Sequence, residues 1–162
     1  LDMNLNNNYR RAIFISTINS VMRNLNLIEG TMHCKDEDPQ ICAEELVKYI
    51  SSKYRSRRIA FVGFQPALVE HCSRLFQINV LDLDKDNIGK KKFGLKILDG
   101  EKEIYRTLKW CDLAVVTGST FVNGTAQRII AQMKDKPILF YGVTVAGIAK
   151  LLNLDRFCCQ GK

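Results

Sequence analysis

The sequence lacks the features of membrane, secreted and fibrous proteins. None of its uninterrupted apolar runs approaches the ~18 residues that a membrane helix needs. No secretory signal is visible, and there is no internal repeat or long linker. In a chain of 162 residues, 46% hydrophobic and 25% charged residues are typical of a globular domain. We therefore expect one cytoplasmic domain, residues 1–162, without a membrane partner.

Motifs of several enzyme classes are also missing. The chain has no G-x-x-x-x-G-K-[ST] phosphate loop and no H-E-x-x-H metalloprotease motif. The order of serine, histidine and aspartate does not indicate a triad, and no paired acids share a helix face. The sequence therefore names no catalytic residue, and it leaves open whether the protein is an enzyme.

Acidic residues are fewer than basic ones. The 24 lysines and arginines exceed the 17 acids and give a net charge of +7, which favours anionic partners. The basic residues gather at 10–11, 53–58 and 90–92, without the interleaved aromatic residues of a nucleic-acid stacking surface. We interpret these runs as solvated surface, and nucleic acid is the least favoured partner.

Six cysteines are present: Cys34, Cys42, Cys72, Cys111, Cys158 and Cys159. Dense disulfides belong to small secreted domains, whereas a chain of this length can bury a sizeable core. The sequence therefore predicts reduced thiols. Cys72 and Cys111 have apolar neighbours, so we expect both in the core.

Two helices are predicted in an N-terminal helical segment, residues 1–57. The first covers residues 8–25, and apolar residues at three-and-four spacing predict its buried face. This face comprises Phe14, Ile18, Val21, Met22 and Leu25. The second helix begins at Asp38 and Pro39 and ends near Tyr54.

Short apolar runs alternate with helical segments in an α/β core, residues 58–162. Strands are predicted at 59–63, 78–84, 95–98, 113–117 and 137–141. The runs lack polar alternation, which is typical of parallel strands covered on both faces. The predicted fold is therefore an α/β, Rossmann-like, doubly wound and mainly parallel sheet of about five strands, with helices on both faces. We expect the strand order 3-2-1-4-5.

Ligands of such sheets bind at the carboxyl ends of the strands where the order reverses. There the loops 63–66 and 117–125 would face each other. The second loop has two glycines, an asparagine and four hydroxyls before a helix, so its N–H groups and the helix dipole favour an anion. The predicted ligand-binding residues are Gly63, Gln65, Asp82, Asp84, Thr117, Gly118, Ser119, Thr120, Asn123, Gly124, Thr125, Gly142 and Thr144. The alternative is a capped turn, with Asn123 as cap and an unusual dihedral at Gly118.

A dinucleotide site would need glycines in the spacing G-x-G-x-x-G. From Gly63 onward the matching positions hold Gln65 and Leu68, which disfavours a dinucleotide. Asp82 and Asp84 lie about 20 residues further, where a ribose-binding acid would stand. An enzyme with a nucleotide-like cofactor is thus an alternative, and solvation of a strand end is the simpler role for these acids.

The segments 117–125 and 141–147, with the cysteine tail, resemble the "putative heavy-metal chelation" domain family, from about Asn8 to the C-terminus. The resemblance implies a Rossmann-like fold, an unassigned function and chelation of a transition or heavy metal ion. Family members with two domains carry a smaller domain ahead of this one. Soft ligands for such an ion are His33, Cys34, Cys42, Cys158 and Cys159.

The spacing of these ligands differs from that of a zinc knuckle, whose ligands come in pairs two to four residues apart. Purely structural roles are therefore the alternative. The function that we expect is a small-ligand or metal-binding domain that holds an anionic or metal-chelated ligand at the crevice. A homodimer is the commonest assembly for such a chain.

Overall fold

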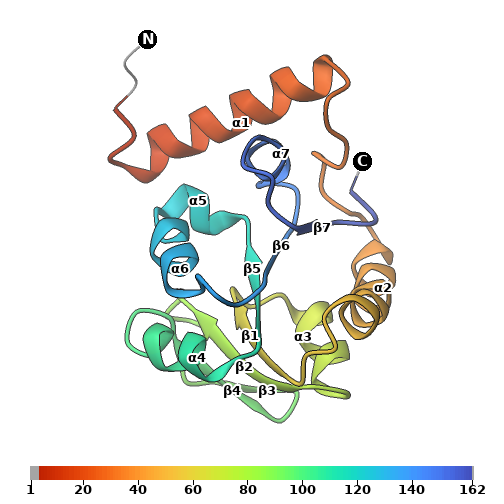
Figure 1. Ribbon diagram of the computed structural model, residues 1–162, viewed down its shortest axis with the longest axis vertical. Coiled ribbons are helices and arrows are strands. Elements are labelled where there is room, and N and C mark those ends of the chain that lie inside the picture. Colours follow the sequence, from red (N-terminus) through yellow and green to blue (C-terminus); the bar gives the residue numbers. More distant parts are fainter. Residues whose placement is uncertain (1–3, 162) are drawn as a thin grey trace.

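The computed structural model describes residues 4–161 and shows one seven-stranded sheet (Figure 1). Its strands are β1 (Arg58–Val62), β2 (Gln77–Asp82), β3 (Lys91–Lys92), β4 (Leu95–Asp99), β5 (Leu113–Thr117), β6 (Ile138–Tyr141) and β7 (Arg156–Phe157). The strand order is β3-β4-β2-β1-β5-β6-β7. All neighbours are parallel except β3 and β4.

Seven helices are described with these strands. They are α1 (Asn8–Asn24), α2 (Asp38–Lys53), α3 (Pro66–Ser73), α4 (Ile104–Trp110), α5 (Ser119–Asn123), α6 (Ala126–Gln132) and α7 (Ala146–Leu151). Within residues 4–161, none of these helices combines the length and apolar character that crossing a membrane requires.

The expected α/β class and mainly parallel sheet are confirmed, but the expected number of about five strands is wrong. The five longer strands follow the order β4-β2-β1-β5-β6, which corresponds to the expected 3-2-1-4-5. The two additional strands, β3 and β7, have two residues each and extend the sheet at its edges. Two residues are too few to produce a recognisable apolar run, so these two strands could not be recognised from the sequence.

Both faces of the central strands are buried because their residues alternate between two apolar clusters. Ile59 and Phe61 of β1 pack with residues of α2 and α3. Ala60, between them, packs with residues of α4, α6 and α7. Each side chain points to the opposite face from its neighbour, so an uninterrupted apolar strand needs helices on both sides.

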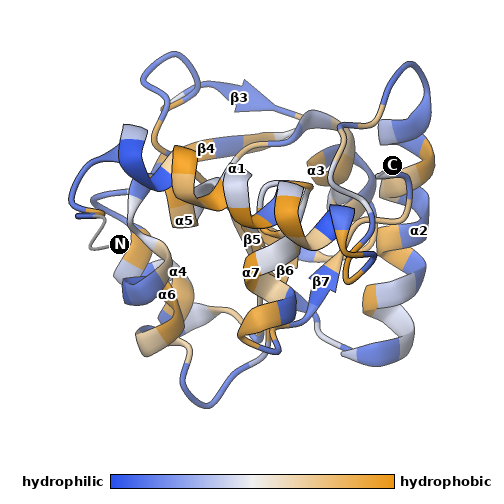
Figure 2. Ribbon diagram, turned by 90° about the horizontal axis from the view of Figure 1, so that it is seen from above, coloured by the Kyte–Doolittle hydropathy of each residue, from blue (hydrophilic) through white to orange (hydrophobic). Residues whose placement is uncertain are grey.

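The buried face predicted for α1 is wrong in part. Met22 is buried, but Phe14, Val21 and Leu25 are 37%, 51% and 59% exposed, and Ile15 is buried in their place. Instead of crossing the sheet, α1 lies over α5 and α7 (Figure 1). Figure 2 shows that apolar residues occur along much of α1.

A polar anchor explains how α1 is turned. The Asn19 side chain donates to the carbonyls of Val143 (3.3 Å) and Thr144 (3.0 Å) and accepts from the Gly147 N–H (2.7 Å). A Cβ at Gly147 would lie 2.6 Å from Ile18 Cγ2, so α1 and α7 pack too closely there for a side chain. The spacing of apolar residues does not indicate such polar contacts, so the orientation of α1 could not be predicted from it.

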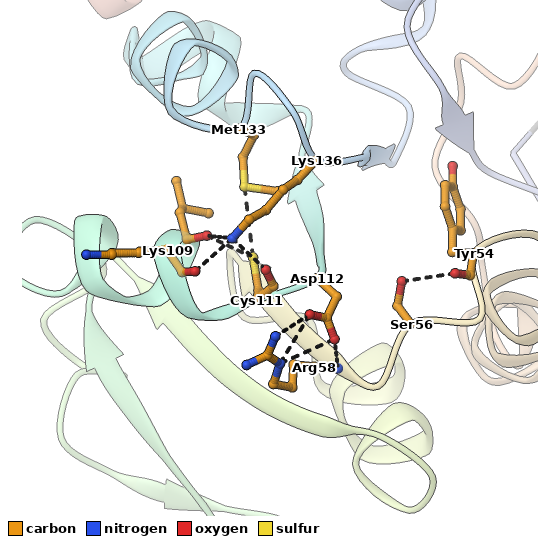
Figure 3. A network of polar contacts seen from close by, with 9 residues as sticks. Tyr54, Ser56, Arg58, Lys109, Cys111, Asp112, Met133 and Lys136 are labelled. Carbon is orange, nitrogen blue, oxygen red and sulfur yellow. Dashed lines mark hydrogen bonds and ion pairs between the residues drawn. The ribbon is translucent and has the colours of Figure 1, made fainter.

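The amino ends of β1 and β5 are joined by side-chain bonds (Figure 3). Arg58 donates to Asp112 at 2.6 Å. Lys136 donates to the carbonyl oxygens of Leu108 (3.1 Å), Lys109 (2.7 Å) and Cys111 (2.8 Å), where α4 ends. At this end of the sheet, the charged side chains of Arg58 and Lys136 therefore already have hydrogen-bond partners within the protein.

Candidate ligand-binding site

A cavity of about 470 Å³ lies at the carboxyl ends of the central strands. β1 and β5 are neighbours, yet β1 continues through α3 to β2 on one side, and β5 continues through α5 and α6 to β6 on the other. The strand order therefore reverses between β1 and β5, which is where ligands of open parallel sheets bind.

Most of the predicted ligand residues line this cavity. They are Gly63, Gln65, Asp82, Thr117, Ser119, Thr120, Asn123, Thr125, Gly142 and Thr144. Asp84, Gly118 and Gly124 are not among its lining residues. The same cavity is lined by His33, Cys34, Cys42 and Cys158, whereas Cys159 lies outside it. Two groups of residues predicted for different purposes thus meet in one space.

The loop 117–125 contains the short helix α5, which the sequence did not predict. Thr120 is buried, and its hydroxyl donates to the Thr117 carbonyl at 2.8 Å, so this side chain stabilises the turn. Ser119 is exposed at the cavity, and its hydroxyl has only a long contact of 3.4 Å with Thr117 Oγ1. Of the two hydroxyls, that of Ser119 is the better placed to bind a ligand.

Two expectations about this loop need correction. Gly118 has an ordinary φ of −57°, but a Cβ there would lie 2.8 Å from the Val145 nitrogen, so close packing requires the glycine. Asn123 does not cap α6, because Thr125 occupies the cap position. Asn123 Oδ1 instead accepts from the Thr125 N–H at 3.1 Å and from its hydroxyl at 2.7 Å.

The first loop is held against the ends of β5 and β6. Gly63 has a φ of +96°, and a Cβ there would lie 2.6 Å from Thr117 Cγ2. The Tyr141 hydroxyl donates to the Gly63 carbonyl at 3.0 Å, and burial raises the pKa of this phenol, so it stays protonated. Gln65 Oε1 caps α3 by accepting from the Leu68 N–H at 2.7 Å. These contacts fix the position of loop 63–66 at the cavity.

Asp82 is already fully hydrogen-bonded. Its carboxylate accepts from the N–H groups of Phe64 (3.2 Å), Leu83 (2.7 Å) and Asp84 (3.0 Å), and from Asn87 Nδ2 (3.0 Å). Four donors match the roughly four lone-pair sites of a carboxylate. Asp84 Oδ1 accepts from the Asp86 N–H at 2.8 Å. These contacts favour the structural role over ribose binding for both acids.

One positively charged side chain at the cavity was not among the predicted ligand-binding residues. Arg128 of α6 is a lining residue, and its guanidinium lies 3.4 Å from Glu101 Oε2. Its position in the first turn of the helix after loop 117–125 was the available signal. A guanidinium is well suited to bind a carboxylate or phosphate. The N–H groups of Gly118, Phe121 and Thr125, which the sequence suggested as anion donors, already donate to backbone carbonyls.

Four cysteines gather where α2 meets the C-terminal tail, residues 155–161. All six cysteines are free thiols, and Cys72 and Cys111 are buried, as expected. Cys159 Sγ lies 3.3 Å from Cys42 Sγ. Burial, Cys42 and Cys158 raise the pKa of Cys34. Burial, followed by the contact with Cys42, raises the pKa of Cys159 to about 12. Burial and the neighbouring thiols therefore favour the protonated form of Cys34 and Cys159.

A complete protein cage for a metal ion is not present in the described part of the chain. Among residues 4–161, no three histidine, cysteine, aspartate or glutamate side chains are grouped to hold one. A soft ion at the thiols would need donor atoms from a bound molecule as well.

A comparison with models of protein families shows which family this chain belongs to. The model of the DUF364 family, described as "putative heavy-metal chelation", matches residues 45–154. This chain belongs to that family. The match is shorter than the resemblance we expected from about residue 8, but it includes both segments, 117–125 and 141–147. The five predicted soft ligands all lie outside the matched residues, so the match itself carries no argument for them.

Solved structures extend the comparison. The chain is 20% identical to a DUF364 protein of unknown function from Pyrococcus horikoshii, with a TM-score of 0.57. The similarity covers 86% of this chain and 50% of that one, so this chain spans about half the length of that relative. A DUF364 protein from Desulfitobacterium hafniense is 17% identical, with a TM-score of 0.46 over 60% of this chain and 38% of that one. No curated protein matches this sequence.

Proposed function

We propose that this domain binds a small anionic ligand in the cavity between β1 and β5, alone or as the complex of a thiophilic metal ion. One observation carries the proposal. A single cavity of about 470 Å³ is lined by Ser119 and Arg128 and also by His33, Cys34 and Cys158. The elements that bear the two groups lie on opposite sides of β5 and β6 (Figure 1).

The part of the cavity near α5 and α6 supports anion binding. The Arg128 guanidinium and the Ser119 hydroxyl line this part and can donate hydrogen bonds to an anion. The N–H groups of Gly118, Phe121 and Thr125 in loop 117–125 already donate to backbone carbonyls, so the two side chains carry the anion site. Hydrogen bonds to a charged group contribute about 1.5–3 kcal/mol each. The ion pair between Arg128 and Glu101 is exposed and long, so an anionic ligand can replace it.

The thiol side supports a soft cation. Thiols and imidazole are the donors that zinc, copper(I) and heavier metals prefer. Two of the four side chains Cys34, Cys42, Cys158 and His33 would provide the protein donors, and the ligand would supply the others. This division fits the absence of a three-residue cage among residues 4–161. The bound ion would link the anion to the protein.

The alternatives have less support. The nucleotide-cofactor alternative relied on Asp82 and Asp84, whose oxygens bind backbone N–H groups. The nucleic-acid alternative relied on the basic runs. These lie on α1, between α2 and β1, and on β3, and Figure 1 shows α1 and β3 at opposite ends of the molecule. Such a separation does not favour one continuous binding groove.

Calorimetric titration of the reduced protein tests the proposal, with citrate as the anion probe and Cd²⁺ as the metal probe. Citrate should bind, and Arg128→Ala should weaken it about tenfold or more, because one charge-assisted bond is lost. Arg106→Ala is the matched control, since Arg106 is an exposed arginine outside the cavity. Cd²⁺ should bind wild-type protein and bind Cys34→Ser and Cys158→Ser more weakly.

Citrate binding that is unchanged in Arg128→Ala would refute the anion site. Cd²⁺ binding that survives in both cysteine variants would refute the metal site and leave the anion site in place. The two parts of the proposal can therefore fail separately.

A further inference from the structure

The C-terminal tail runs along one face of α2. The Asp155 carboxylate accepts from Lys53 Nζ at 2.8 Å. Two residues later, the Phe157 ring lies 5.3 Å from the Tyr49 ring, measured between centroids. Alternate residues of an extended chain point the same way, so these contacts define both the face and the direction. The tail is antiparallel to α2.

Cys159 is the next residue in this register. It lies two residues beyond Phe157, and its Sγ is 3.3 Å from Cys42 Sγ. On α2, residues 42, 49 and 53 are separated by seven and four positions and therefore share one helix face. The contact between the two thiols is thus the third contact of the tail along this face of α2.

Cys158 points the other way. It lies between the end of β7 and a bend at Cys159, and it lines the cavity, whereas Cys159 does not. The two adjacent cysteines therefore have different surroundings. The short contact between the sulfur atoms of Cys42 and Cys159 selects Cys159, and not Cys158, as the partner of Cys42.

The tail is fixed on its other side as well. The Arg156 guanidinium donates to the carbonyls of Glu29, Gly30 and Gly142. β7 pairs with β6, with Phe157 opposite Tyr141. These bonds keep Cys159 close to α2 while both thiols are reduced.

We propose that Cys42 and Cys159 form a reversible disulfide that fastens the tail to α2. The inference stands on the tail register and is independent of the proposed ligand. The contact distance of 3.3 Å must shorten to about 2.05 Å, the length of a disulfide bond. A movement of this size is within the reach of two side chains.

The oxidant is a low-molecular-weight disulfide, RSSR, such as glutathione disulfide. Cys159 is exposed and Cys42 is buried, so Cys159 reacts first. Its thiolate attacks one sulfur of RSSR, a mixed disulfide forms, and RS⁻ leaves. The Cys42 thiolate then attacks the Cys159 sulfur and displaces the second RS⁻. The two protons of the protein thiols end on two RSH molecules, so the protein dithiol is oxidised and RSSR is reduced.

Oxidation changes the cavity. Cys42 is a lining residue, and in the disulfide its sulfur no longer binds a metal ion. The bond also closes a loop of 117 residues, and cross-links across long loops stabilise most. Such a link should raise the midpoint of thermal unfolding by roughly 10 °C.

The test incubates the whole chain with glutathione disulfide, alkylates the remaining thiols and identifies linked peptides by mass spectrometry. The expected product links Cys42 to Cys159 and leaves four alkylated cysteines. Cys158→Ser should form the same link and is the matched control. Cys159→Ser should form none. Cys42→Ala should stop at the mixed disulfide on Cys159, because the second thiol is missing.

A link from Cys42 to Cys34 or Cys158 would overturn the register. A wild-type protein that stops at the mixed disulfide, with Cys42 alkylated, would overturn the pairing. Cys159 is exposed, so Cys159→Ser should fold, and its circular dichroism and unfolding midpoint in the reduced state should equal those of wild type. The test therefore does not depend on a substitution of buried Cys42.

Discussion

The two ends of the sheet differ in how closely their positively charged side chains are bonded within the protein. At the amino ends of β1 and β5, Arg58 binds Asp112, and Lys136 donates to three carbonyl oxygens (Figure 3). An open hollow near Arg58 exists there, but its charged pair is already formed. At the carboxyl ends, Ser119 and Arg128 face a cavity with only long polar contacts. Bonds within the protein stabilise the first end, and donors that lack short partners at the second end are the basis of the binding site that we propose.

The largest effect is expected for Gly118→Val, which tests whether the cavity depends on close backbone packing. The new Cβ would lie 2.8 Å from the Val145 nitrogen, so the loop or α7 must move. We expect the free energy of unfolding to fall by about 3 kcal/mol in urea denaturation.

Gly89→Ala is the control for this prediction. Gly89 has a φ of +83° but no atom within 4 Å of its Cβ position, so only backbone strain of about 1 kcal/mol is expected. Equal losses in the two variants would mean that close packing at Gly118 has no special role.

Lys136→Met should lower the stability by about 2 kcal/mol, since three carbonyl oxygens at the end of α4 lose their donor. Citrate affinity should not change, because Lys136 is at the opposite end of the sheet. Lys134→Met is the matched control, since Lys134 is exposed and its substitution should change stability by less than about 0.5 kcal/mol. A lower citrate affinity in Lys136→Met would contradict the claim that the amino ends of the strands do not contribute to ligand binding.

Thr120→Ala and Ser119→Ala sharpen the comparison within one loop. Thr120 is buried and donates to the Thr117 carbonyl, so its loss should reduce the stability by about 1 kcal/mol. Ser119 is exposed, so its substitution should leave stability nearly unchanged and weaken citrate binding. Titration and urea denaturation of both variants measure this difference, and a reversed pattern would contradict the assignment.

The smallest effect concerns pH at the amino end. The Arg58 guanidinium lowers the pKa of Asp112 in the folded protein. Such a carboxylate stabilises the fold above its ordinary pKa of about 3.9, and the contribution is lost as pH falls through the lowered folded value. Asp112→Asn should therefore reduce the acid dependence of the unfolding midpoint below about pH 4. An unchanged acid profile would show that the pair contributes nothing.

The positions of the five longer strands could be predicted from the sequence because each apolar run ends at a glycine or polar residue, and their order agrees with that of a doubly wound sheet. The switch-point loops followed from that order. The position of α1 could not be predicted, since the Asn19 anchor is formed with residues more than 120 positions away. Arg128 was missed for a related reason: only the packing of α6 shows that this exposed arginine borders the cavity.

The sequence also suggested the soft ligands one by one, but it did not bring them together. His33 and Cys34 lie in the connection before α2, and Cys158 follows β7, which has only two residues. Their common cavity depends on the pairing of β7 with β6, a long-range contact without a local signal.

Native mass spectrometry of protein purified without chelator tests the central claim most directly. The measurement compares wild-type protein with the double variant that carries Arg128→Ala and Ser119→Ala. The account predicts that wild-type protein and Lys136→Met retain a small anionic molecule, and that the double variant loses it while it stays folded. A wild-type mass equal to that of the bare chain, or a retained molecule that persists in the double variant, would contradict ligand binding at this end of the sheet.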